Sequence, residues 1–94
     1  MTLKQLQERL TQWHIDKHGR AEPNMERTAL KLCEETGEIA KAIIRKDTKN
    51  LEEEVADVFI VLLHLTRGLN KDILELAESK LIVIEQRLKE RQKC

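Results

Sequence analysis

Residues 34–63, EETGEIAKAIIRKDTKNLEEEVADVFIVLL, decide how this chain folds. Apolar residues recur at helical spacing over the first part of the stretch, and residues 47–50 then form a short polar turn. Between residues 55 and 65 only Asp57 and His64 are not apolar. The stretch therefore predicts two consecutive helices, of which the second is hydrophobic around most of its circumference.

The residues before this stretch predict another helix and the start of the pair. Apolar residues three or four apart mark the first helix, namely Leu3, Leu6, Leu10 and Trp13. Gly19 and Pro23 then interrupt the helical pattern. Asn24 can cap a second helix that runs to about Lys46. The inward arc of this helix is expected to contain Ala29, Leu30, Cys33, Ala40, Ile43 and Ile44.

A third and a fourth helix are expected after the polar turn. Asn50, with Glu53 three residues later, fits a capping arrangement for the third helix, which ends near Gly68. Asn70 is expected to start the fourth helix. Its inward residues are expected to be Ile73, Leu74, Ala77, Leu81, Ile84 and Leu88. With three Gly, one Pro and 2% aromatic residues, the chain lacks the turns and strand formers of a β-sandwich or barrel, so an all-α fold is predicted.

The length and the third helix together predict assembly. Short connections favour antiparallel neighbours, so residues 1–94 are expected to form one domain, an antiparallel four-helix bundle. A monomer of this size buries only about 60–65% of its chain surface, which is too little to wrap a helix that is apolar on all sides. We therefore expect a homo-oligomer, either a homodimer or a dimer-of-dimers tetramer.

Charge and apolar runs exclude several classes of partner. Seventeen basic residues balance seventeen acidic ones, which argues against binding nucleic acid or an anionic membrane through bulk charge. The longest apolar run is far shorter than the roughly 20 residues of a membrane span, and the N-terminus does not resemble a secretory signal. Cys33 and Cys94 are expected to be free thiols, the former buried. These features predict a cytoplasmic protein.

The acidic residues gather in the centre of the chain. Residues 34–57 hold eight acidic and four basic side chains, a local charge of −4. On a helix, Glu35 and Glu38 are neighbours on one face, as are Glu54 and Asp57, and antiparallel helices could bring the two pairs together. Two carboxylates about 5 Å apart repel by roughly 3 kcal/mol at an effective dielectric constant near 20. The acids must therefore be protonated, stay apart in water, or share a cation, for which Mg²⁺ or Mn²⁺ suits oxygen ligands best.

The two carboxylate pairs differ in how well an ordinary structural role explains them. On a helical wheel the glutamates of residues 34–38 lie outside the predicted apolar arc, beside Lys31 and Lys41, as expected of a solvated face. Asp57 instead lies among Ile60 and Val61, where an unpaired buried charge would be costly. A functional role is therefore the better interpretation for Asp57.

The motifs resemble a known family. The sequence E-E-x-x-E at residues 34–38, a gap of fifteen residues, and E-x-x-D at residues 54–57 running into an apolar helix resemble the MazG-like nucleotide pyrophosphohydrolases. These enzymes are all-α nucleoside triphosphate pyrophosphatases. The resemblance covers about residues 28–88. It implies Mg²⁺-dependent hydrolysis of (d)NTPs to (d)NMP and pyrophosphate, with a house-cleaning role in removing unwanted or excess nucleotides.

The resemblance also implies roles for individual residues. The implied Mg²⁺ ligands are Glu35, Glu38, Glu54 and Asp57. Glu34 would either orient the attacking water or help to hold a second ion. Lys80 on the last helix would contact substrate phosphates, with Arg87 as a further candidate, whereas Ile84 stands where the family often has Asn. Trp13 would either stack on the nucleobase or anchor the core.

Two other functions fit parts of the sequence. A related all-α pyrophosphatase acting on a phosphoribosylated nucleotide could use the same carboxylates. A non-enzymatic helical oligomerisation module would explain the apolar third helix, but it would require Asp57 to form an ion pair across the interface. His64 shares a helix face with Asp57 and could contact a ligand, although a hydrogen-bonded core histidine is the simpler interpretation.

Overall fold

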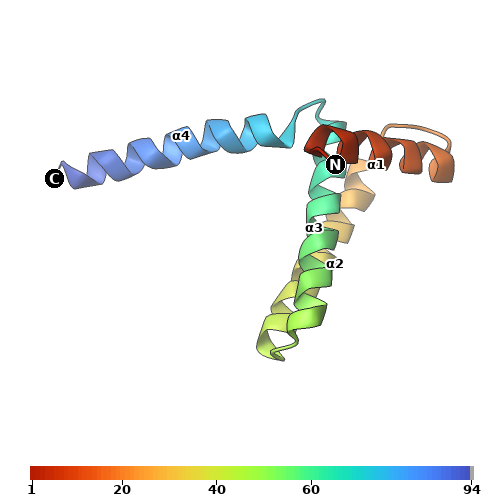
Figure 1. The fold of residues 1–94 in the computed structure, drawn as a ribbon, viewed down its shortest axis with the longest axis horizontal. Helices are drawn as coiled ribbons and strands as arrows, with labels where there is room; N and C mark the ends of the chain where they lie inside the picture. Colours follow the sequence, from red (N-terminus) through yellow and green to blue (C-terminus); the bar gives the residue numbers. More distant parts are fainter. Residues whose placement is uncertain (94) are drawn as a thin grey trace.

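The computed structural model describes residues 1–93, and this part of the chain forms four helices and no strand (Figure 1). In chain order the helices are α1 (Leu3–His18), α2 (Met25–Ile44), α3 (Thr48–Gly68) and α4 (Ile73–Gln92). The predicted all-α class is confirmed. None of these helices combines the length and the apolar character needed to cross a membrane.

The helix caps confirm one predicted start and correct two. Asn24 caps α2 by accepting a hydrogen bond from the amide of Arg27 at 3.0 Å, as expected. By contrast, α3 is capped by Asp47 and α4 by Asp72, so the predicted starts at Asn50 and Asn70 are wrong.

Asn70 ends α3 rather than starting α4. It takes the left-handed conformation, φ 55°, which asparagine tolerates, and its amide donates to the Arg67 carbonyl. The next amide, of Lys71, donates to the carbonyl of Thr66 at 3.0 Å. Lys46, which follows α2, also takes the left-handed conformation, with φ 57°. These closed helix ends leave only short connections on either side of α3.

Helices α2 and α3 form an antiparallel hairpin, which is the main packing unit of the chain (Figure 1). Its buried side chains are Glu35 and Ala42 on α2 and Val61, Leu63 and Thr66 on α3. The inward arc predicted for α2 is wrong. Leu30, Ile43 and Ile44 are 58–80% exposed, and Ala29, Ala40 and the free Cys33 are exposed as well. Cys94 lies outside the described residues.

The side of α2 that faces α3 carries a different stripe. The stripe consists of Leu32, Glu35, Ile39 and Ala42, which are spaced by three or four residues and are buried or half-buried. Because Glu35 is polar, the spacing of apolar residues in the sequence does not reveal this stripe. The outward stripe is more hydrophobic, and it remains exposed in the structure of residues 1–93.

Helix α1 crosses the end of the hairpin and is fixed to it by polar contacts. His14 is buried, and its Nδ1–H donates to the carbonyl of Arg20 at 2.8 Å, because a carbonyl can only accept. Arg67 Nε donates to the carbonyl of Ala21 at 2.9 Å, across 46 residues of chain. The loop between α1 and α2 is thereby held against the end of α3.

Helix α4 extends away from the rest of the chain and packs only against the end of α3 (Figure 1). Of its predicted inward residues, Ile73 alone is half-buried, and Leu74, Ala77, Leu81, Ile84 and Leu88 are exposed. The radius of gyration is 16.4 Å, against about 12 Å for a compact domain of this length. One chain therefore does not form the compact four-helix bundle that short connections predicted, because the turn at residues 69–72 directs α4 outward.

Candidate metal centre

Three carboxylates from α2 and α3 converge on one point of the hairpin. Glu35, Glu54 and Asp57 each offer an oxygen, and these oxygens all lie within 4.8 Å of one another. Glu54 and Asp57 are three residues apart on α3, and antiparallel pairing places Glu35 of α2 opposite them. Within residues 1–93 no other group of three His, Cys, Asp or Glu side chains has this geometry.

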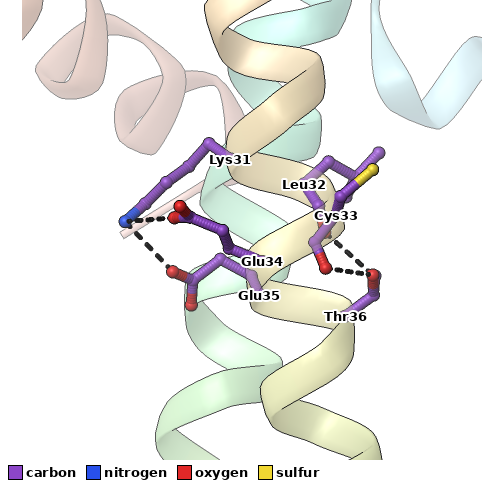
Figure 2. Close-up of polar contacts among 6 residues, drawn as sticks. All are labelled: Lys31, Leu32, Cys33, Glu34, Glu35 and Thr36. Atoms are coloured by element: carbon purple, nitrogen blue, oxygen red, sulfur yellow. Dashed lines mark hydrogen bonds and ion pairs between the residues drawn. The ribbon is translucent and has the colours of Figure 1, made fainter.

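Glu35 is the buried member of the cluster and its negative charge is stabilised. Lys31, one turn earlier on α2, places Nζ 3.1 Å from Glu35 Oε1 (Figure 2). The hydrogen bond from Lys31 lowers the pKa of Glu35, and contact with Glu54 and Asp57 acts in the same direction. Burial opposes this shift without reversing it. Glu35 therefore keeps its charge to a lower pH than an ordinary glutamate does.

Glu54 has the opposite tendency. The adjoining Glu35 carboxyl raises its pKa, together with desolvation and the negative charges of Asp57 and Glu38. Its Oε2 is buried and has no hydrogen-bond partner among the described residues. A buried oxygen without a partner is costly, and a cation bound there would remove both the desolvation and the repulsion.

A cleft of about 460 Å³ opens beside the carboxylates. Glu35 and Asp57 line it, together with four basic side chains and an aromatic group. The basic residues are Lys17, Arg20, Arg27 and Lys31, and the aromatic group consists of Trp13, His14, His18 and His64. The volume lies within the range of small-molecule sites, about 300–1,000 Å³. Acidic and basic groups in one cleft suit a ligand that carries negative charge and binds together with a cation.

Comparison with protein-family models assigns the chain. The model of the MazG nucleotide pyrophosphohydrolase domain matches residues 24–90. The chain belongs to this family. The match begins at the cap of α2, includes both carboxylate pairs and reaches into α4, so family membership supports a nucleotide pyrophosphohydrolase kind of activity. No match was found among curated proteins or among solved structures.

The structure reverses the burial expected for two of the predicted ligands. Glu35, placed by its sequence neighbours on a solvated face, is buried with 11% of its side chain exposed. Asp57, expected to be buried among apolar residues, is exposed. The orientation of α2 accounts for Glu35, because it turns Glu35 rather than the outward apolar stripe toward α3.

Glu34 and Glu38 lie beside the cluster rather than in it. Glu34 is 71% exposed and its Oε2 lies 3.9 Å from Lys31 Nζ, so Lys31 contacts both neighbouring glutamates (Figure 2). Glu38 is half-exposed and its Oε1 lies 3.6 Å from Lys41 Nζ. Neither belongs to the group of oxygens within 4.8 Å, although the charge of Glu38 acts on Glu54.

The residues predicted to bind substrate are divided between two places. Trp13 lines the cleft and is half-exposed, with its indole 5.0 Å from Lys17 Nζ, so it is not a core anchor. Lys80 and Arg87 lie on α4, are exposed and do not line the cleft. Within a single chain they are therefore separated from the carboxylates.

Basic residues of the cleft were missed by sequence reasoning, although a signal was present. Arg27, Lys31 and Glu35 follow one another at intervals of four residues, so they lie on one face of α2. Lys31 and Glu35 alone fit an ordinary surface ion pair. Together with Arg27, the pattern indicates a row of basic side chains along α2 that leads to the carboxylates.

The cluster fits a hard divalent ion. Its donors are all carboxylate oxygens, as Mg²⁺ and Mn²⁺ prefer, and one buried oxygen has no other partner. The three carboxylates carry more negative charge than Lys31 alone neutralises. The arrangement could thus hold a cation and place it beside an anionic ligand in the cleft.

Proposed function

We propose that this protein is a Mg²⁺-dependent nucleoside triphosphate pyrophosphohydrolase that converts (d)NTPs to (d)NMP and pyrophosphate. One observation carries the proposal, which is that Glu35, Glu54 and Asp57 converge beside a cleft lined with basic and aromatic side chains. Membership of the MazG family supports the same class of reaction. A cellular role in removing unwanted or excess nucleotides follows from such an activity.

In this proposal the carboxylates of the hairpin hold the metal. Glu35, Glu54 and Asp57 supply the three oxygens that already converge, and Glu38 supplies a fourth when its contact with Lys41 opens. When bound, Mg²⁺, or Mn²⁺ in its place, neutralises phosphate oxygens and makes a bound water more acidic. The pairing of Lys31 with Glu35 keeps that ligand ionised.

The remaining groups act on water and phosphate. Water adds across the bridge between the α- and β-phosphates: a new P–O bond forms, the bridging P–O bond breaks and pyrophosphate leaves. Glu34, exposed beside the cluster, accepts the proton of the attacking water or orients it. Arg27 and Lys31 line the cleft, and they would neutralise the phosphate oxygens of a bound substrate.

Lys80 and Arg87 enter the proposal through a second copy of the chain. The outward stripe of α2 and the side chains of α4 leave large apolar residues exposed, among them Leu30, Ile44, Leu81, Ile82 and Ile84. A homo-oligomer, either a dimer or a tetramer, would cover them and could bring α4 of one copy to the cleft of another. The whole chain then acts as one domain, because α1 supplies part of the cleft.

The decisive experiment measures pyrophosphate release from a panel of dNTPs and NTPs with Mg²⁺ and with EDTA. Release is expected only with the metal, and Glu54→Gln and Asp57→Asn should lower kcat at least about hundredfold, the scale for loss of a group that acts in the transition state. Glu52→Gln, at an exposed position of α3 outside the cluster, is the matched control and should retain activity. Persistent release in EDTA would contradict the metal mechanism. Preference for a phosphoribosylated nucleotide would select the related pyrophosphatase instead.

A further inference from the structure

A second pocket, of about 270 Å³, lies where α1 crosses the end of α3 and the chain turns into α4 (Figure 1). It shares no lining residue with the cleft beside the carboxylates, so the two cavities are separate. Its polar lining comes from α1, from the end of α3 and from the connection to α4, namely Gln7, Thr11, Thr66, Arg67, Lys71 and Asp72.

Arg67 brings a positive charge to this pocket that no carboxylate neutralises. Its side chain is half-buried, and none of the ion pairs within residues 1–93 includes it. Desolvation lowers the pKa of Arg67, and no acidic group of the described chain acts in the opposite direction. A charge removed from water is costly unless an opposite charge lies beside it. An anion next to the guanidinium would offset this cost.

The guanidinium of Arg67 is held in place while one of its edges stays accessible. Its Nε donates to the carbonyl of Ala21 at 2.9 Å, which fixes the orientation of the group. Its Nη2 is buried and has no hydrogen-bond partner among the described residues, whereas Nη1 is not one of the buried atoms. Arg67 lines this pocket and does not line the cleft, so the accessible edge with Nη1 faces the pocket.

Lys71 adds a second cation to the same pocket. Its amide donates to the Thr66 carbonyl at 3.0 Å, so its backbone is fixed, while its side chain is exposed and forms no ion pair within residues 1–93. Asp72 is the acidic residue of the lining, and its Oδ1 already accepts the hydrogen bond from the amide of Leu74 that caps α4. Two basic side chains and one acidic side chain leave the pocket with a net positive charge.

We propose that this second pocket binds a phosphate group, with Arg67 Nη1 and the Lys71 ammonium group as its charged contacts. Two cations suit a doubly charged phosphate better than a singly charged carboxylate, and guanidinium groups match the spacing of phosphate oxygens. The pocket is smaller than typical sites for drug-sized molecules, which favours a compact anion. None of its residues belongs to the proposed catalytic site, so the inference goes beyond the proposed function and does not depend on it.

An NMR titration of the protein with inorganic phosphate tests this site. It is carried out in EDTA, so that metal ions do not bring phosphate to the carboxylates, and at constant ionic strength, since screening alone alters surface charges. The amide signals of Thr11, Lys71 and Asp72 should shift together and give one dissociation constant. Acetate should shift them less. Ribose 5-phosphate, titrated in parallel, distinguishes a phosphate ester from the free ion by which of the two binds more tightly.

Three variants separate this pocket from the cleft. Lys71→Gln should weaken phosphate binding at least about tenfold, as expected for loss of a charge-assisted contact, and it breaks no contact of the folded chain. Lys49→Gln, exposed at the start of α3, is the matched control and should bind like the wild type. Arg27→Gln removes a basic residue of the cleft and should leave the response of Thr11 and Asp72 unchanged.

Two results would overturn the inference. One is equal phosphate affinity of Lys71→Gln and Lys49→Gln. The other is a set of shifts confined to the cleft and abolished by Arg27→Gln, which would place the anion at the catalytic site. Pyrophosphate release by Lys71→Gln in phosphate-free buffer should equal that of the wild type, because Lys71 lies outside the cleft. A failure of the phosphate site therefore leaves the proposed function standing.

Discussion

Glu35 and Glu54 face each other across the α2–α3 hairpin with opposite preferences for a proton. The hydrogen bond from Lys31 lowers the pKa of Glu35, and the contact with Glu35 raises the pKa of Glu54. A carboxyl oxygen of each lies within 4.8 Å of the other and of Asp57. At neutral pH the hairpin therefore contains a repulsion that a divalent cation would relieve.

Replacing Glu54 should stabilise the metal-free protein. Its native pKa lies above the ordinary value of 4.5, so between these two values the native state binds more protons than the unfolded state, and stability falls as the pH rises. Glu54→Gln removes this loss of stability, because glutamine cannot ionise. The variant should therefore unfold at a higher temperature than the wild type at pH 7 in EDTA, but not below pH 4.5. Glu52→Gln serves as the control. A lower unfolding temperature for Glu54→Gln at pH 7 would show that this carboxylate has a stabilising partner.

Magnesium should stabilise the wild-type protein against thermal unfolding. A ligand present at a hundred times its Kd contributes about 2.7 kcal/mol when it binds only the native state. Asp57→Asn and Glu54→Gln should lose most of the temperature shift between Mg²⁺ and EDTA, because each removes an oxygen of the cluster. An undiminished shift in both variants would place the ion elsewhere.

Lys31→Gln should separate metal binding from substrate binding. Lys31 Nζ lies 3.1 Å from Glu35 Oε1 and lines the cleft, so its removal lowers the positive charge near both ligands. Mg²⁺ affinity, measured by calorimetry, should increase, while KM for the triphosphate should rise. Lys49→Gln is the matched control, since Lys49 is exposed at the start of α3 and does not line the cleft. Identical behaviour of the two variants would argue against a phosphate contact by Lys31.

The neutral imidazole of His64 should make stability depend on pH. Desolvation lowers its native pKa to about 4 from an ordinary value of 6.5, so the unfolded state binds more protons between these values. Its contribution to stability is present above pH 6.5 and is lost as the pH falls toward 4. Urea unfolding at several pH values should show a shallower decline for His64→Asn. Parallel curves for both proteins would contradict the burial of this ring.

Mixed oligomers should recover activity if α4 completes the site of a neighbouring copy. Glu54→Gln lacks one carboxylate of the cluster and Lys80→Ala lacks the proposed phosphate contact on α4, so each protein alone should be weakly active. Mixing them after dissociation creates a site with an intact cluster and a lysine from the other copy. Pyrophosphate release should exceed the mean of the two separate proteins. Light scattering that shows a monomer at micromolar concentration would remove the basis of this expectation.

Local sequence patterns predicted the elements better than their packing. The helices and the cap at Asn24 follow from spacing and side-chain chemistry within a few residues. The sequence pattern predicted the cap of α3 at Asn50, whereas the structure places it three residues earlier, at Asp47. The direction of α4 depends on the closed end at Asn70, which no periodicity reports.

The candidate site was predictable as a set of residue types but not as an arrangement. The spacing of Glu54 and Asp57 indicated a shared face, and the structure places their oxygens together with that of Glu35. The burial of Glu35 was predicted wrongly, because the outward stripe of α2 is more hydrophobic than the stripe that contains Glu35. Contacts between distant segments, such as Trp13 with His64, have no signal in the sequence of either segment.

The outward course of α4 has a consequence for how the molecule denatures. A helix that contacts little of its own chain gains almost no free energy from folding alone, so in the proposed homo-oligomer most of its stabilisation would come from association. Unfolding should then become a higher-order equilibrium whose midpoint rises with protein concentration. Dilution, without any denaturant, should make residues 73–92 the first segment to be cut by a protease.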